Sequence, residues 1–107
     1  MTESSLEVTD NESRAVQKTP NRVSLDYIKS RIRAVEYIYP DSIPHMTIAV
    51  ISYENGFSFV GKSAPADSEN FNKELGKKFA YEDAVRQIWP VEGFALRERM
   101  SGPLMRA

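Results

Sequence analysis

The sequence predicts a small α+β domain in which an antiparallel β-hairpin packs against helices, behind a disordered N-terminal tail. Two observations carry this prediction. Apolar residues recur with a helical spacing of about 3.6 on either side of a segment, Met46 to Ser63, where the spacing changes to two. The dipeptide Asn55-Gly56, typical of hairpin turns, lies inside that segment. The expected order is α-β-β-α with a further short helix, and the 107 residues suit one domain.

The first 22 residues are polar and show no regular apolar spacing. Leu6, Val8 and Val16 are their only large aliphatic side chains, so the segment can bury little apolar surface. We therefore expect a disordered tail over residues 1–22 and a single domain over residues 23–107. The functional alternative for the tail is an arm that binds a partner.

A helix is expected to begin after Ser24, whose hydroxyl can accept a hydrogen bond from a free N–H of the first turn. Pro40 sets its latest end, because a proline disfavours helical geometry in the residue before it. Apolar residues between these limits follow at spacings of three and four, which places them on one helix face: Leu25, Ile28, Ile32 and Val35.

The hairpin prediction places Asn55-Gly56 in a two-residue type I′ turn, which pairs Ser52 with Phe59. The face predicted to form the core carries Met46, Ile48, Val50, Phe57 and Phe59. The opposite face carries Thr47, Ala49, Ile51, Tyr53, Ser58, Val60 and Lys62. That second face is too apolar for water, so we expect a third strand, a helix or a second subunit to cover it. A homodimer is one such arrangement.

After a loop over residues 64–68, Asp67 or Ser68 is expected to cap a helix that runs to about Trp89. Pro90 ends this helix or starts the next one, since proline is tolerated in a first helical turn. Residues 91–100 are predicted to form a separate short helix that stops at Gly102-Pro103.

Several kinds of chemistry are excluded or disfavoured by composition and spacing. The chain has no Cys and a single His, His45, so thiolate chemistry and mechanisms with two histidines are excluded. The glycines form no phosphate-binding motif. Glu82 and Asp83 are adjacent on a predicted helix and point in different directions, so they do not converge on a metal ion. We expect no enzyme, no cofactor and no metal.

Basic residues on the long predicted helix offer one alternative function, contact with the phosphates of a nucleic acid. They are Lys73, Lys77, Lys78 and Arg86. A helix, a hairpin and a second helix with Lys-Lys resemble a double-stranded-RNA-binding domain in outline. The net charge of −1 disfavours this alternative, because nucleic-acid-binding domains are usually basic. The competing interpretation is a solvated helix face.

Aromatic side chains suggest a protein-binding surface instead, since tyrosine and tryptophan often anchor interfaces. The predicted partner-binding residues are Tyr53, Val60 and Tyr81, whereas Trp89 is assigned to the core. No apolar run approaches the ~20 residues of a membrane helix, and the N-terminus lacks the pattern of a signal peptide. We therefore expect a cytoplasmic protein with a protein partner and no membrane association.

A set of short motifs between Thr47 and Leu96 carries a family resemblance: Asn55-Gly56-Phe57, Gly61-x-Ser63-Ala64, Asn70-Phe71, Glu74-x-Gly76, Ala80, Ala84 and Ile88-Trp89-Pro90-x-Glu92-Gly93. With the preceding helix from about Val23, this set resembles the small tailed-phage protein family named after gp49 of phage N4 and gene 66 of phage Sf6. The resemblance implies a phage or prophage accessory protein that acts in the infected bacterium. It implies no activity and carries over no functional residue.

Overall fold

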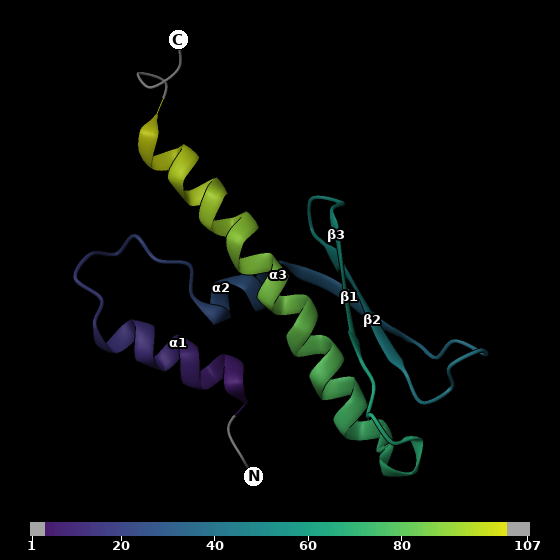
Figure 1. Ribbon diagram of the computed structural model, residues 1–107. Helices are drawn as coiled ribbons and strands as arrows, with labels where there is room; N and C mark the ends of the chain where they lie inside the picture. Colours follow the sequence, from purple (N-terminus) through teal and green to yellow (C-terminus); the bar gives the residue numbers. More distant parts are fainter. Residues whose placement is uncertain (1–3, 103–107) are drawn as a thin grey trace.

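The computed structural model describes residues 4–102, which form three α-helices, a short 3-10 helix and a three-stranded sheet (Figure 1). The elements are α1 (Ser5–Ala15), α2 (Leu25–Arg31), β1 (Ile32–Ile38), β2 (Thr47–Tyr53), β3 (Ser58–Ser63), η1 (Ser68–Asn70) and α3 (Lys73–Ser101). The sheet is antiparallel in the order β1-β2-β3. The helices pack on one face of it, with α3 over β2 and β3. The α+β prediction is confirmed, with one strand more than expected.

The third strand comes from the second half of the first predicted helix. Ser24 caps α2 as expected and accepts a hydrogen bond from the Tyr27 N–H at 3.0 Å. The helix ends at Arg31, however, and residues 32–38 pair with β2 as β1. The prediction was wrong here because Ile32 and Val35 suit either a helix face or a strand. The branched and aromatic side chains of this segment favour a strand once β2 is available as a partner.

The hairpin forms, but its register is shifted by one residue from the predicted one. Ile51 pairs with Phe59, and the connection is a three-residue loop in which Gly56 has a φ of 91°. The Tyr53 N–H donates to the Phe57 carbonyl at 2.9 Å and closes this loop. Because side chains alternate along a strand, a shift of one residue brings the other set of β2 side chains onto the face that carries Phe59. The core face is therefore Thr47, Ala49, Ile51, Tyr53 and Phe59, not the predicted one.

Helix α3 supplies the cover that the second face was expected to need. A Cβ atom on Gly61 of β3 would lie 2.2 Å from the Ala80 carbonyl oxygen and 2.3 Å from the Ala84 nitrogen, so the helix backbone rests directly on the strand. Ala49 and Ile51 are fully buried beneath it. Homodimerisation stays a prediction, but these residues no longer give a reason for it.

Helix α3 starts later and ends later than predicted. Asn72 is its cap and accepts from the Leu75 N–H at 3.0 Å, whereas Asp67 caps η1. The helix then continues through Pro90 to Ser101, so the predicted break at Pro90 is wrong. Pro90 is exposed, which allows water to reach the helix where the proline cannot donate a hydrogen bond. The predicted stop is confirmed at Gly102, while Pro103 lies outside the described residues.

The predicted disordered tail contains helix α1. Ser4 caps this helix and accepts from the Glu7 N–H at 3.2 Å. Leu6 is only 3% exposed and joins the core of the domain. The expectation of disorder was based on the polar composition of this segment. The burial of Leu6 and the polar contacts described below hold α1 against the domain despite that composition. Residues 1–3 of the predicted tail lie outside the described residues. Among the described helices, none has the length and hydrophobicity needed to cross a membrane.

Candidate functional site

A buried ion cluster ties three elements together at the hairpin end of the sheet. Glu92 of α3 is 1% exposed, and its Oε2 accepts hydrogen bonds from Arg31 Nη1 at 2.7 Å and from the Tyr53 hydroxyl. Arg31, the last residue of α2, also donates from Nε to Glu54 at 2.8 Å. The cluster thus joins α2, the hairpin and α3.

Two members of this cluster, Tyr53 and Arg31, are held in their ordinary protonation states by their surroundings. Burial and the hydrogen bond to Glu92 raise the pKa of Tyr53, which keeps its hydroxyl protonated. Hydrogen bonds and charge from Glu54 and Glu92 raise the pKa of Arg31 despite its partial burial. Its guanidinium also lies 4.8 Å from the centroid of the Tyr53 ring. Because Tyr53 stays protonated and Arg31 stays charged, the cluster suits a structural role better than proton transfer.

Beside the cluster lies a pocket of about 150 Å³ between the hairpin tip and α3. Exposed apolar side chains surround it: Phe57 is 57% exposed and Val91 is 44% exposed. Phe94 follows on α3 and is 69% exposed. We call Phe57, Val91 and Ala95, which line the pocket, together with Phe94, which precedes Ala95 on α3, the hairpin-end surface. Aromatic side chains this exposed are typical of binding sites, because their burial by a partner releases water from a large apolar area.

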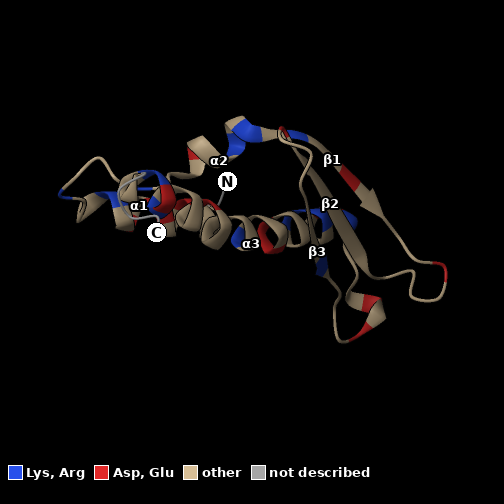
Figure 2. Ribbon diagram, turned by 90° about the horizontal axis from the view of Figure 1, so that it is seen from above, with Lys and Arg blue, Asp and Glu red and all other residues tan. Residues whose placement is uncertain are grey.

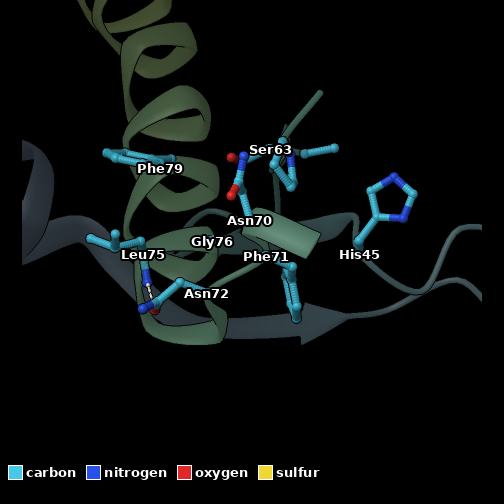
Figure 3. Close-up of a pocket in the computed structure, with 10 residues that line it drawn as sticks. His45, Ser63, Asn70, Phe71, Asn72, Leu75, Gly76 and Phe79 are labelled. Atoms are coloured by element: carbon cyan, nitrogen blue, oxygen red, sulfur yellow. Dashed lines mark hydrogen bonds between the residues drawn. The ribbon is translucent and has the colours of Figure 1, made fainter. Parts of the chain in front are cut away.

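A second pocket, of about 220 Å³, lies at the opposite end of the domain, near the start of α3 (Figure 3). Phe71, Leu75 and Phe79 contribute apolar walls, and His45 lies at its edge. The side-chain oxygen of Asn72 accepts the capping hydrogen bond from the Leu75 N–H of α3. Within residues 4–102, His45 makes no hydrogen bond or ion pair, and the lining shows no set of polar groups arranged for catalysis.

The three predicted partner-binding residues do not share one surface. Tyr53 is 3% exposed, lies in the ion cluster and lines the pocket beside it. Tyr81 is half-buried against the core. Val60 is 51% exposed and sits on the helix-free face of the sheet.

The four predicted nucleic-acid-binding residues are also separated. The Lys73 ammonium lies 5.1 Å from the ring centroid of Tyr39, and that of Lys77 lies 5.5 Å from the ring of Tyr37, so both face β1. Arg86 instead hydrogen-bonds Ser5 of α1, and Lys78 is half-buried. Figure 2 shows acidic and basic residues interspersed over the fold rather than one continuous basic face.

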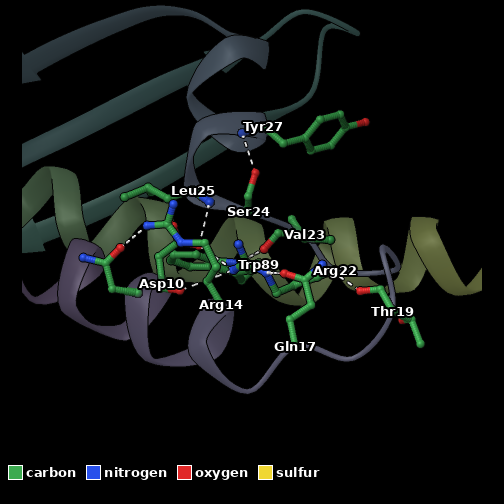
Figure 4. A network of polar contacts seen from close by, with 11 residues as sticks. Asp10, Arg14, Gln17, Thr19, Arg22, Val23, Ser24, Leu25, Tyr27 and Trp89 are labelled. Atoms are coloured by element: carbon green, nitrogen blue, oxygen red, sulfur yellow. Dashed lines mark hydrogen bonds and ion pairs between the residues drawn. The ribbon is translucent and has the colours of Figure 1, made fainter.

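A polar network holds α1 against the rest of the domain (Figure 4). Asp10 Oδ1 accepts from Arg22 Nη1 at 2.7 Å and from the Leu25 N–H at 3.0 Å. Burial alone would raise the pKa of Asp10, but the hydrogen bonds and the charge of Arg22 outweigh it and lower the pKa. Nearby, the Trp89 indole donates to the Val23 carbonyl at 2.9 Å, and its ring packs against the core as predicted.

The sequence interpretation missed Glu92 and Phe57 as site residues. Glu92 was noted only as part of the family motif, and nothing local shows that Arg31 and Tyr53 meet it. Phe57 was assigned to the core together with Phe59, but it lies at the end of the hairpin loop, where more than half of its side chain stays exposed. Among residues 4–102, no group of three or more His, Cys, Asp or Glu side chains could hold a metal ion.

One of the comparisons with known proteins found a match. A family model described as phage protein (N4 Gp49/phage Sf6 gene 66) matches residues 23–100. The chain belongs to this family. The matched region runs from just before α2 almost to the end of α3, so α1 lies outside it. No curated protein and no solved structure matched the chain.

Proposed function

We propose that this phage-family protein is a non-enzymatic accessory protein that binds another protein, from the host or the phage, in the bacterial cytoplasm. The hairpin-end surface carries the proposal. Phe57 and Phe94 are more than half exposed, although water-exposed aromatic rings are costly unless a partner covers them.

The support beneath this surface also favours protein binding. The Arg31–Glu92–Tyr53 cluster fixes the hairpin relative to α3, so Phe57 and Val91 are held at a set separation before any partner arrives. A preorganised apolar patch binds more tightly than a mobile one, because less side-chain freedom is lost on association. Exposed Glu54 and Asn55 at the rim can add polar specificity.

The proposal is tested by a pull-down from a bacterial host lysate with and without nuclease, at low and at high salt. The full-length protein should retain one defined protein. The double variant Phe57→Ser with Phe94→Ser should lose it, because both apolar anchors are gone. Val16→Ser is the matched control, since Val16 is 75% exposed but lies beyond the end of α1, outside the hairpin-end surface.

Two results would contradict the proposal. Retention of the same protein by the Phe57/Phe94 double variant would show that another surface binds it. Recovery of nucleic acid that disappears with nuclease or high salt would favour the alternative function through Lys73, Lys77, Lys78 and Arg86, because phosphate contacts weaken steeply with salt. Circular dichroism of each variant checks that the loss is not caused by unfolding.

A further inference from the structure

The two edge strands of the sheet, β3 and β1, differ in whether other parts of the chain hydrogen-bond to their outward backbone groups. On the β3 edge, the Lys62 N–H donates to Asp83 Oδ2 of α3 at 3.0 Å. The Val60 carbonyl accepts from Gln87 Nε2 of the same helix at 2.7 Å. Side chains of α3 therefore hydrogen-bond to backbone groups of β3 that would otherwise be unpaired on this edge.

The register identifies the corresponding open groups of β1. Because the Val60 backbone faces away from β2, its partner Val50 must direct its own backbone groups toward β1. Val50 pairs there with Glu36, which consequently faces β2. Backbone direction alternates along a strand, so the N–H and C=O groups of Val35 and Tyr37 point away from the sheet.

No described part of the chain occupies this β1 edge. Among residues 4–102, no hydrogen bond reaches the outward groups of Val35 and Tyr37, and α3 lies over β2 and β3 instead. The strand is seven residues long and contains no proline or lysine. Unpaired edges of this kind are templates for another strand, which is why most proteins shorten, charge or cover them.

Two lysine side chains of α3 lie beside the unpaired β1 edge. Lys73 and Lys77 lie over Tyr39 and Tyr37, on the helix side of the sheet, and neither forms an ion pair within the described residues. A strand added to β1 would lie about 4.8 Å away, with every second side chain on the helix side. An acidic side chain opposite Tyr37 would then come within reach of the Lys77 ammonium.

We propose that the β1 edge binds an extended acidic segment of a partner protein as a fourth strand. Its main chain pairs with Val35 and Tyr37, and its helix-side carboxylates meet Lys73 and Lys77. This site is separate from the hairpin-end surface, so either proposal can fail alone. A second copy of the chain fits less well, because it would offer Val35 and Tyr37 of its own β1, which carry no acid.

The test is a nuclear magnetic resonance titration of the isotope-labelled full-length chain with two capped peptides. One alternates Glu and Val over seven residues, the length of β1, and the other alternates Lys and Val. The Glu peptide should shift the amide signals of Val35 and Tyr37 and slow their hydrogen exchange. The Lys peptide should leave these signals unchanged.

Variants separate the charge contribution from the main-chain pairing. Lys73→Gln and Lys77→Gln should each weaken binding of the Glu peptide about threefold, as expected for exposed ion pairs. Lys78→Gln makes the same charge change on the adjacent residue and should have no effect. All three positions have side chains with some exposure, and a thermal melt of each variant confirms that it folds.

Four outcomes would overturn the proposal. The first is no shift at Val35 or Tyr37 with the Glu peptide at about 1 mM, a concentration that reveals even weak binding. The second is equal binding of the Lys peptide. The third is a shift of these signals by a single-stranded oligonucleotide and not by the peptide, which would assign the lysines to nucleic acid. The fourth is slow exchange of both amides in the free protein at concentrations where it dimerises, which would assign the edge to a second copy.

Discussion

The two halves of α3 are held in place by different forces. Residues 73–89 lie on the sheet, and small residues there let the backbones approach: Gly61 of β3 sits directly against Ala80 and Ala84. Residues 90–101 extend away from the sheet (Figure 1). Glu92 anchors that part through Arg31 and Tyr53, while Phe94 remains exposed.

The difference shows how one continuous helix can serve two purposes. The first half is fixed by steric fit, which tolerates almost no added volume, and by hydrogen bonds of Asp83 and Gln87 to β3. The second half is fixed by hydrogen-bonded charges, which orient it while leaving an apolar side available for a partner. Three predictions test this contrast, beginning with the largest expected effect, and a fourth tests how α1 is held against the domain.

Gly61→Ala should destabilise the protein most, by about 3 kcal/mol, because the new Cβ would meet the α3 backbone rather than a flexible side chain. Gly93→Ala is the control in the second half of the helix. A Cβ there meets no atom within 4 Å, so this change should stabilise the helix by about 0.5 to 1 kcal/mol. Denaturant unfolding measures both. Equal effects of the two substitutions would abolish the contrast between the halves.

Glu92→Ala should cost about 2 to 3 kcal/mol, since it leaves the Tyr53 hydroxyl buried without an acceptor and removes one partner of Arg31. Glu54→Ala removes the other partner of Arg31. The Glu54 side chain is 53% exposed, so this substitution should cost less than about 1 kcal/mol. The same unfolding measurement compares them. A cost for Glu54→Ala as large as that for Glu92→Ala would show that burial does not distinguish the two carboxylates.

Pro90→Ala tests whether the two halves form one helix. In a continuous helix the substitution restores a backbone hydrogen bond, so stability should rise by about 1 to 2 kcal/mol, part of the ~3 kcal/mol that an interior proline costs. If the helix ended at Pro90, the gain would be close to zero. Thermal unfolding and the helical circular dichroism signal measure the change.

Acid should release α1 before it disturbs the sheet. The pKa of Asp10 is lower in the folded state than the ordinary value of 3.8. Its contribution is therefore fully present above 3.8 and is lost as the pH falls through the lower folded value. Trp89, the single Trp of the chain, lies beside the Asp10 network, so its fluorescence reports the change.

The variant Asp10→Asn supplies the control for this smallest effect. It should weaken the α1 contacts at neutral pH and remove the part of the acid-induced fluorescence change that comes from Asp10. An acid profile identical to that of the unmodified protein would show that Asp10 does not anchor α1.

Local signals in the sequence predicted the elements better than their arrangement. Ser24 as a cap and Asn55-Gly56 as the hairpin tip were found correctly, because each acts within a few residues. The segment 32–38 was assigned to a helix because its apolar spacing fits both structures. Only pairing with β2 favours the strand.

The candidate site was hardest to predict because its members are far apart in the chain. Arg31, Tyr53 and Glu92 come from three elements, and no local pattern in the sequence shows that they meet. Phe57 lies only two residues before buried Phe59, and its exposure follows from its position at the end of the hairpin loop, not from the residue itself.

The sequence alone determined the α+β class, the family, the hairpin and the absence of thiol chemistry, since these follow from composition, short motifs and local turn geometry. Tertiary structure decided the core face of the sheet, the continuity of α3 through Pro90 and the ordering of α1. Each of these depends on contacts between distant segments, whose packing outweighs local preferences of a few tenths to about 1 kcal/mol per residue.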